Sequence, residues 1–374
     1  MIAYLGLTPQ AVRWTPASPA GAQSRAQWTV QTSGTSARLR GISAVTDRIA
    51  WASGSDSTVL RTLDSGGTWR KLTVTNDKLD FRDIDAFDAR TAYLLSIGNG
   101  PASRIYKTTD GGATWTLQFK NDDPKAFYDA MSFWDRNHGI VIGDSIDGKF
   151  CIMTTENGGR NWNRVPDNVL PPALENEGAF AASGTNIAIF GKSHAWIATG
   201  GARKGRVLRT TDRGRTWTIA ETPLQAGSSA GIFSIAFRNA TAGVIVGGDY
   251  TKENEAVDNL SVTTDGGGTW TLVKGLSGYR SVVAYVPGSN SLVAVGPSGV
   301  DCSTDDGRTW QRSDIGSQYR PAVAGGSPNK SAIRNSKPEI PQGFDTLCFA
   351  RRRVRGAAVG WAAGARGNIA MIKF

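Results

Sequence analysis

Two kinds of side chain in this 374-residue sequence could carry chemistry. Carboxylates are the first kind, because a glycosidase needs two carboxyl groups about 5–10 Å apart across the bond that it cleaves. Guanidinium groups are the second kind, because arginine binds a carboxylate through two parallel hydrogen bonds. The sequence is therefore compatible with two functions, those of a glycan-active enzyme and of a binder of acidic peptides.

The arginines recur in a repeated strand pattern. An alignment on the apolar residue near the strand end superposes LRGISAV, FRDIDAF, FYDAMSF and YRSVVAY. One equivalent position near the strand start then holds Arg40, Arg82, Tyr128 and Arg280. Because symmetry would place these side chains around the entrance of a channel, we predict an arginine ring that clamps a carboxylate or an acidic peptide. The alternative is a set of solvated strand starts without a ligand.

The carboxylates lie near the same strand start and in loops predicted on the same face. The candidate binding residues from this group are Asp129, Asp144, Asp147, Glu175, Glu177 and Asp249, with Tyr250 beside the last. A glycosidase pair would come from Asp129, Asp144, Glu175, Glu177 or Asp249. Side chains that are adjacent in a strand point to opposite faces, so Tyr128 and Asp129 are not expected to form a tyrosine–acid pair of the sialidase type.

Composition disfavours several other chemistries. With only 2 histidines, histidine-based catalysis and multi-histidine metal sites are not expected. Cys151, Cys302 and Cys348 are far apart, so we predict reduced thiols. We predict no metal, no cofactor and no nucleic-acid partner. The net charge of +10 is spread over many turns, and its one dense run, residues 351–355, is either a solvated turn or an anionic docking patch.

A motif of the form Thr/Ser-x-Asp/Asn-x-Gly-x-x-Trp defines the elements that must position these residues. Its central and final residues are Asp64 and Trp69, Asp110 and Trp115, Asn157 and Trp162, Asp212 and Trp217, Asp265 and Trp270, and Asp305 and Trp310. The steps between copies are 46, 47, 55, 53 and 40 residues. A period of this length, with four short strands per repeat, predicts β-propeller blades.

The motif itself is predicted to be structural. Its glycine can take positive φ in a tight turn, and its carboxylate can accept hydrogen bonds from the amides of that turn. The tryptophan can pack its large ring between neighbouring sheets. No proton-transfer partner accompanies the motif, so it is not interpreted as a repeated active site.

Six copies nevertheless predict seven blades. After the last copy, GFDTLCFA, GAAVGWAAGA and NIAMIKF supply three strands, and residues 27–30 near the N-terminus resemble an outer strand that carries Trp28. Joining the two ends would remove open sheet edges. We therefore predict an all-β, seven-bladed β-propeller of four-stranded antiparallel blades over residues 27–374, with the last blade closed by the N-terminal strand.

The remaining segments are loops and a tail. The loops 165–178, 250–260 and 316–343 are predicted to rise on the face of the arginine ring, and 316–343 is a candidate lid. Residues 1–26 are interpreted as a signal-peptide remnant or a disordered tail, because Ala20-Gly21-Ala22-Gln23 fits a small-x-small cleavage site. We expect a periplasmic or secreted protein, or a cytoplasmic one if this segment is not a truncated signal peptide. No transmembrane span is expected.

The repeated motifs are Asp boxes, or BNR repeats, and the chain resembles bacterial propellers related to the photosystem II stability/assembly factor. The resemblance covers residues 27–374 and rests on FYDAMSF, ENEGAFAASGTNIA, GIFSIAF, GGDY and GYRSVVAY. It implies a monomeric, non-enzymatic scaffold that binds a protein or peptide. Sialidases and some other glycoside hydrolases also carry Asp boxes, but the Arg-Ile-Pro signature of sialidases is absent. Members of the resembling subfamily are often labelled oxidoreductases, and no dinucleotide fingerprint is present, so the redox function ranks third.

Overall fold

The computed structural model describes residues 26–313, 343–351 and 356–374. The predictions for the N-terminal tail and for the 316–343 lid fall almost entirely outside these residues, and so do Arg352, Arg353 and Arg355. Among the described residues, no helix is long and apolar enough to cross a membrane.

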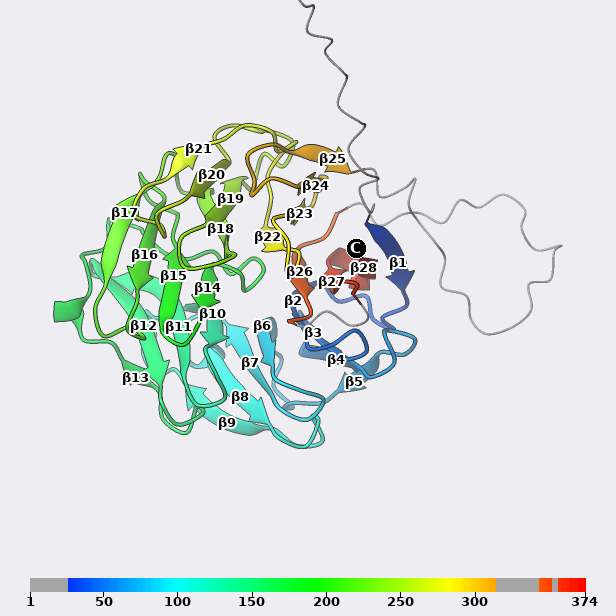
Figure 1. Cartoon of the computed structure of the whole chain (residues 1–374). Helices are drawn as coiled ribbons and strands as arrows, with labels where there is room; N and C mark the ends of the chain where they lie inside the picture. Colours follow the sequence, from blue (N-terminus) through cyan, green and yellow to red (C-terminus); the bar gives the residue numbers. More distant parts are fainter. Residues whose placement is uncertain (1–25, 314–342, 352–355) are drawn as a thin grey trace, which may run out of the picture.

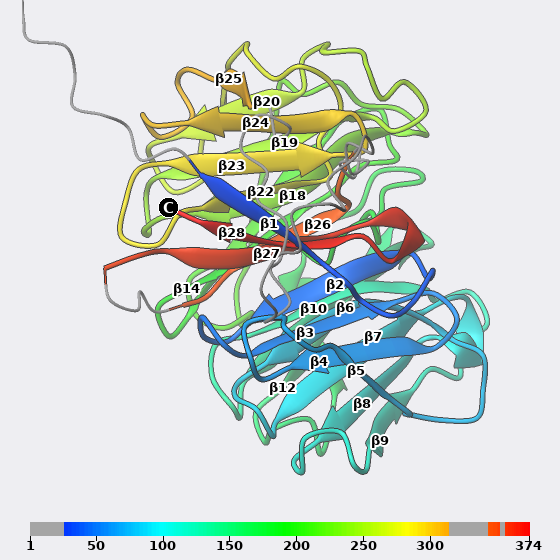
Figure 2. The same ribbon diagram turned by 90° about the vertical axis from the view of Figure 1, so that its right-hand side faces the viewer.

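Seven four-stranded antiparallel sheets form the described chain. Figure 1 shows them arranged as blades around one axis, and Figure 2 shows the ring from its side. The predicted seven-bladed β-propeller is therefore confirmed. In each of blades 1 to 6, four consecutive strands run from the axis to the rim.

The first three blades follow the chain from its N-terminal side. Blade 1 consists of β2 (Leu39–Ala44), β3 (Ala50–Gly54), β4 (Thr58–Thr62) and β5 (Arg70–Leu72). Blade 2 consists of β6 (Asp80–Ala86), β7 (Ala92–Ile97), β8 (Arg104–Thr108) and β9 (Thr116–Lys120), with the short helix η1 (Gly100–Ala102) between β7 and β8. Blade 3 consists of β10 (Tyr128–Phe133), β11 (Gly139–Ile146), β12 (Lys149–Thr155) and β13 (Asn163–Arg164), and η2 (Asp167–Val169) follows it.

The next three blades repeat this plan. Blade 4 consists of β14 (Ile187–Phe190), β15 (His194–Ala198), β16 (Arg206–Thr210) and β17 (Thr218–Glu221). Blade 5 consists of β18 (Ala230–Phe237), β19 (Gly243–Asp249), β20 (Leu260–Thr263) and β21 (Thr271–Leu272). Blade 6 consists of β22 (Val282–Tyr285), β23 (Leu292–Gly296), β24 (Gly299–Ser303) and β25 (Gln311–Ser313).

Blade 7 joins the two ends of the chain, as predicted. It consists of β26 (Thr346–Phe349), β27 (Val359–Ala363), β28 (Ile369–Lys373) and the N-terminal strand β1 (Gln27–Gln31), with η4 (Ala365–Gly367) between β27 and β28. All five residues of β1 pair with β28. Trp28 is fully buried and stacks on Phe344, with ring centroids 5.4 Å apart. The closure therefore combines strand pairing with burial of a large ring.

The repeated motif forms the turn between the third and fourth strands of blades 1 to 6. In the second copy, the amide of Gly112 donates to Thr108 Oγ1 at 2.9 Å, and the amide and hydroxyl of Thr114 donate to the Asp110 carboxylate at 3.0 and 2.6 Å. These bonds to the Thr114 hydroxyl and amide lower the pKa of the Asp110 carboxyl. The Thr and Asp side chains of the motif thus close their hydrogen bonds within one turn, whereas the amide of Gly111 donates to Arg90 O outside it at 2.9 Å.

The core lies between adjacent blades, where rings from second strands reach the next blade. Trp51 Nε1 donates to Asp88 O at 3.1 Å, and Tyr93 OH donates to Gly158 O at 2.8 Å. Trp196 Nε1 repeats this bond with Gly266 O at 2.7 Å. Each ring fills the space between two sheets and satisfies its polar atom on the neighbouring turn, which fixes the blades side by side.

Candidate functional site

Four inner strands carry a β-bulge at the same place. The unpaired residues are Arg40 in β2, Arg82 in β6, Asp129 in β10 and Phe233 in β18. A bulge leaves one residue outside the ladder and turns its side chain in a new direction. We call these four residues the axial cluster, because the innermost strands surround the axis of the ring (Figure 1).

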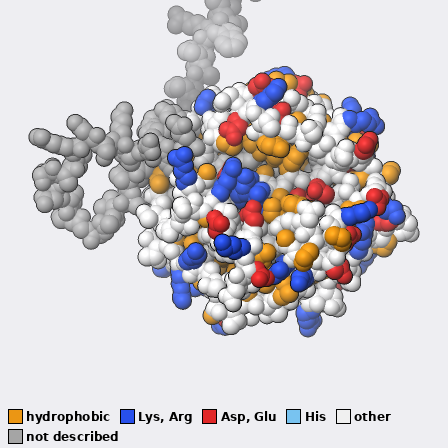
Figure 3. Space-filling model, turned by 180° about the vertical axis from the view of Figure 1, so that it is seen from behind, with side chains coloured by type: hydrophobic (Ala, Val, Ile, Leu, Met, Phe, Trp, Pro, Cys, Tyr) orange, Lys and Arg blue, Asp and Glu red, His pale blue; other side chains and the backbone are white. Residues whose placement is uncertain are grey.

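The axial cluster lies at the face opposite to that of Figure 1, where the inner strand β2 begins (Figure 2). Figure 3 shows this face: Lys and Arg side chains gather near its centre, with hydrophobic side chains beside them.

The axis at this face is crossed by residues 178–185, which we call the axial segment. Arg40 Nη1 donates to Ala182 O at 3.2 Å, and Arg82 Nη1 donates to Ala181 O at 2.8 Å. On its other side, Ser183 Oγ donates to Ser281 O of blade 6 at 2.9 Å. The segment thus contacts blades that lie on opposite sides of the ring, and it covers the axis where we predicted a channel entrance.

Small residues allow the axial segment to approach the inner strands closely. Gly184 has φ +71°, and a Cβ at this position would lie 2.4 Å from the carboxylate of Asp83. That carboxylate is buried and accepts the amide of Met131 at 2.7 Å. A larger residue at 184 would therefore disturb both the segment and the contact between blades 2 and 3.

Arg40 is a cation without a matching carboxylate. The Asp345 carboxylate is held by Arg38 through bonds of 2.7 and 2.8 Å, and Arg82 pairs with Asp80 at 2.9 Å. No carboxylate among the described residues lies within ion-pair distance of Arg40. Burial, and then the charge of Arg82, lower the pKa of Arg40 to about 10, so it stays protonated at neutral pH.

Asp129 and Asp144 form an acidic pair beside Arg82. Asp129 is 1% exposed, and its Oδ2 has no hydrogen-bond partner among the described residues. Burial, and then the charge of Asp144, raise the pKa of Asp129 well above its ordinary value, although Arg82 opposes this effect. Burial raises the pKa of Asp144 to about 6. The structure therefore brings together Arg40, Arg82, Asp129 and Asp144 of the predicted residues.

Arg280 and Tyr128 do not belong to the axial cluster, which corrects the predicted ring. Arg280 is fully buried, and its Nε donates to Asp301 Oδ2 at 2.8 Å. Tyr128 is buried against Phe119, with ring centroids 5.5 Å apart, and burial raises its pKa to about 12. Both are needed for packing and ion pairing inside the blades.

The error is a shift of one residue in the sequence alignment. The bond that ends each inner strand runs from Phe87 N to Thr91 O in blade 2, from Trp134 N to His138 O in blade 3 and from Val286 N to Ser291 O in blade 6. Counting back from these bonds, the equivalents of Arg82 are Asp129 and Ser281. A shift of one residue moves a side chain to the opposite face of its strand, so the alignment selected residues that face the core.

Glu177, which was predicted as a binding residue, is instead part of the buried structure of the loop. It is buried and forms an ion pair with Arg206, whose Nε donates to Glu177 Oε1 at 2.9 Å. Glu177 Oε2 accepts the amide of Leu174 at 2.8 Å, so the carboxylate fixes the end of the 165–178 loop.

Among the described residues, the other predicted loop residues form no hydrogen bond or ion pair with Arg40. Glu175 is exposed, Asp147 makes a loose ion pair with Lys125 at 3.4 Å, and Asp249 accepts the hydroxyl of its neighbour Thr251. Tyr250 is 48% exposed. Of these residues, Tyr250 contacts Phe233 of the axial cluster, with ring centroids 6.1 Å apart.

Sequence reasoning named Tyr250 but missed the aromatic cluster to which it belongs. The cluster consists of Phe180, Phe233, Tyr250 and Tyr279. Phe180 and Phe233 are stacked, with ring centroids 4.0 Å apart and planes 4° apart. The segments GAFAASG and GIFSIAF contain two of these rings, but only the bulge in β18 shows that Phe233 stands where blades 1 and 2 have arginine.

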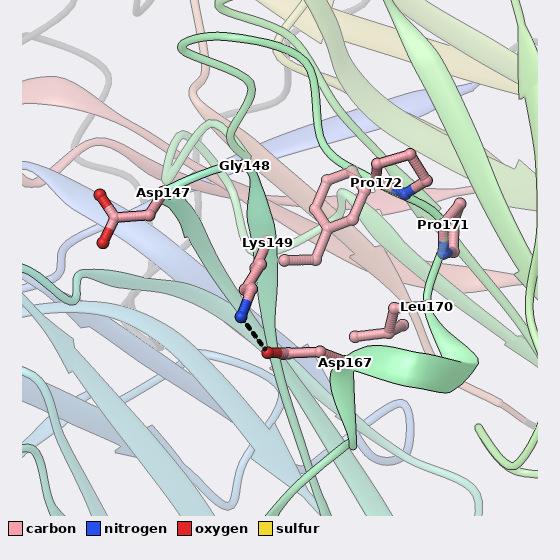
Figure 4. Close-up of a pocket in the computed structure, with 8 residues that line it drawn as sticks. Asp147, Gly148, Lys149, Asp167, Leu170, Pro171 and Pro172 are labelled. Carbon is pink, nitrogen blue, oxygen red and sulfur yellow. Dashed lines mark ion pairs between the residues drawn. The ribbon is translucent and has the colours of Figure 1, made fainter.

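A separate cavity of about 300 Å³ lies farther out on blade 3 (Figure 4). Its walls are residues 147–150, Asp167 and residues 170–172, and Lys149 forms an ion pair with Asp167 at 2.9 Å. None of the axial residues lines it. Among the described residues, no group of three or more His, Cys, Asp or Glu side chains could hold a metal ion, and the three cysteines are unpaired.

Comparisons with known proteins identify the fold. No family model matches this chain, and no curated protein matches it. The solved structure of YCF48 bound to a D1 peptide has a TM-score of 0.61 at 17% identity, covering 92% of this chain and 96% of the other. YCF48 from Cyanidioschyzon merolae has a TM-score of 0.58 at 17% identity, covering 92% and 98%. A streptogramin B lyase has a TM-score of 0.61 at 13% identity, covering 93% and 97%. At these identities the likeness establishes a shared propeller fold, which is found in a peptide-bound protein and in an enzyme.

Proposed function

We propose that this protein is a non-enzymatic scaffold that binds an extended acidic peptide of a partner protein on the face of the axial cluster. The observation that carries the proposal is the position of Arg40 and Arg82. Both lie at equivalent β-bulges, which direct their side chains to one place beside the axial segment. The resemblance of the chain to assembly-factor propellers supports a role of this protein in the assembly or stability of its partner.

The charge balance favours an anionic ligand. Arg82 has Asp80 as a partner, but Arg40 has only a carbonyl, and the two guanidinium groups repel each other. A carboxylate of the ligand would relieve this repulsion, and hydrogen bonds to charged groups contribute about 1.5–3 kcal/mol each. One protein with the same fold is known with a bound peptide, so a propeller of this size can present a peptide-binding surface.

The test is a peptide-binding measurement with a charge-matched control. An array of fluorescein-labelled 12-residue peptides, acidic and neutral, is titrated with the wild type and with the Arg40→Ala/Arg82→Ala variant. The control is Arg203→Ala/Lys204→Ala, which removes two exposed cations from the turn between β15 and β16. We expect acidic peptides to lose at least about tenfold in affinity only in the first variant. Equal losses in both variants would mean that the binding is nonspecific attraction to net charge.

A glycan-active enzyme is the second candidate, and the pair Asp129 and Asp144 favours it. Burial raises the pKa of both carboxyl groups, which is the direction that a general acid needs, and their pairing supplies the second carboxyl group of a glycosidase. A screen on aryl glycosides tests this function. Activity that disappears in both Asp129→Asn and Asp144→Asn would support the enzyme, and no turnover by the wild type would reject it for the glycosides screened.

A further inference from the structure

We propose that the aromatic cluster is a second subsite, which receives an aromatic side chain of the same peptide that Arg40 and Arg82 hold by a carboxylate. This inference rests on the proposed function and specifies its ligand. The peptide would carry an acidic group and, a few residues away, a phenylalanine, tyrosine or tryptophan.

A buried residue of the axial segment links the two subsites. Phe233 occupies in blade 5 the bulge position that Arg40 occupies in blade 1. Ala182 of the axial segment connects them, because its carbonyl accepts the bond from Arg40 and its side chain packs against Phe233 and Tyr279. The axial segment is therefore bordered by cations from blades 1 and 2 and by aromatic rings from blades 5 and 6.

The aromatic cluster is rigid at its base and open at its top. Phe180 lies against Gly200, where a Cβ would be 2.3 Å from the ring, so the position of the ring depends on the absence of a side chain. Tyr250 stands edge-on to the stacked pair, with centroids 6.3 Å from Phe180 and 6.1 Å from Phe233, and it is 48% exposed. An exposed ring held by other rings offers a surface for edge-to-face contact with a further aromatic side chain.

Charge decides in favour of a peptide as the occupant. A neutral sugar could also lie on exposed rings, but it would leave Arg40 without a counter-charge. A peptide with a carboxylate and an aromatic side chain can contact both the arginines and the aromatic cluster. On the face that contains this surface, basic and hydrophobic side chains lie next to each other near the centre (Figure 3).

The experiment uses the full-length protein and synthetic peptides of alanine and glycine that end in two aspartates. One series contains phenylalanine two to five residues before the acidic end, and the matched series contains alanine at the same positions. For the best spacing, we expect the phenylalanine peptide to bind the wild type about 2- to 10-fold more tightly than its alanine counterpart. Tyr250→Ala should abolish this difference and leave the affinity for the alanine peptide unchanged. Tyr250→Phe should preserve it.

Val257→Ala is the control, because Val257 is an equally exposed apolar residue, at 47%, in the segment that follows Tyr250. It should leave the affinity of both peptides unchanged. Arg40→Ala/Arg82→Ala should weaken both series equally. Equal binding of the two series to the wild type at every spacing would overturn the aromatic subsite and leave the acidic-peptide function intact. If neither series binds, both proposals fail. Binding of a neutral oligosaccharide that depends on Tyr250, without a phenylalanine preference, would assign the cluster to glycans and overturn this inference.

Discussion

Glu177 and Arg206 form an ion pair whose side chains are almost completely enclosed, with exposed fractions of 0% and 9%. Arg206 also donates to Pro172 O at 2.9 Å, and Thr199 Oγ1 donates to Glu177 Oε1 at 2.6 Å. The pair therefore ties the 165–178 loop to blade 4, directly before the axial segment begins. A residue that sequence analysis proposed as a ligand-binding carboxylate instead anchors the loop that leads into the axial segment.

Removal of the charge of Glu177 should destabilise the protein strongly. Glu177→Gln leaves the Arg206 guanidinium buried without a counter-ion, which costs about 3–5 kcal/mol. The free energy of unfolding from urea denaturation measures this effect. The control is Glu156→Gln, since Glu156 and Arg215 are 3.7 Å apart and both 71% exposed, and exposed pairs contribute about 0–1 kcal/mol. Similar losses in the two variants would show that the buried pair is not an anchor.

Truncation of Trp28 should weaken the closure of the ring. Trp28→Ala removes a fully buried ring that stacks on Phe344, so we expect a loss of about 3–5 kcal/mol. Thermal and urea denaturation would show this loss. Leu117→Ala in the outer strand β9 is the comparison, because Leu117 is 45% exposed and its truncation should change the stability by only about 0.5 kcal/mol. A wild-type stability in Trp28→Ala would mean that β1 is not needed to close the ring.

Replacement of Asp144 should make stability less dependent on pH. The pKa of Asp144 in the folded protein is about 6, above its ordinary value of 3.8, so folding favours the protonated form. Its favourable effect is complete below about pH 4 and is lost as the pH rises through 6. Asparagine cannot ionise and can still accept the amide of Ala179. The melting temperature of Asp144→Asn relative to wild type should therefore increase between pH 4.5 and pH 8.

The control for this pH effect is Asp147→Asn. Asp147 is exposed and has only a loose partner in Lys125, so its replacement should give no comparable trend between pH 4.5 and pH 8. An advantage of Asp144→Asn that decreases with rising pH would contradict the assignment of a raised pKa.

Two substitutions of Asp265 in the repeated motif should destabilise the protein to different degrees. Asp265 Oδ1 accepts the amide of Thr269 at 3.0 Å, and Oδ2 accepts its hydroxyl at 2.7 Å. Asp265→Ala loses these two bonds and the bond from the Thr263 hydroxyl at 2.8 Å, and it should cost about 3 kcal/mol, at about 1 kcal/mol for each. Asp265→Asn should cost less, because Asn157 in blade 3 keeps the corresponding amide bond at 3.0 Å. Denaturation at pH 7 would rank the variants, and equal losses would mean that the negative charge itself is required.

Much of the fold could be predicted because its signals are local. The spacing of the tryptophans and the turn glycines gives the number of blades, since the Thr/Ser and Asp/Asn side chains of each turn close their hydrogen bonds within eight residues. The segment that contains Trp28 could be recognised as the missing outer strand, because an open sheet edge is unfavourable and the last blade lacked one strand. For the candidate site, Arg40, Arg82, Asp129 and Asp144 were found because they lie near the ends of strands that converge on one face.

The tertiary structure decided which side chains face the axis. A shift of one residue in the alignment exchanged the expected places of Tyr128 and Asp129, and blade 6 has Ser281 where an arginine was expected, because the two faces of a strand alternate at every residue. The β-bulge that the four inner strands share also leaves no mark in the alternation of the sequence. The burial of Glu177 by Arg206 and the contact of Phe233 with Phe180 likewise depend on residues from other blades. The sequence by itself determined the architecture, whereas the chemistry of the axial surface depends on how the ring brings distant strands together.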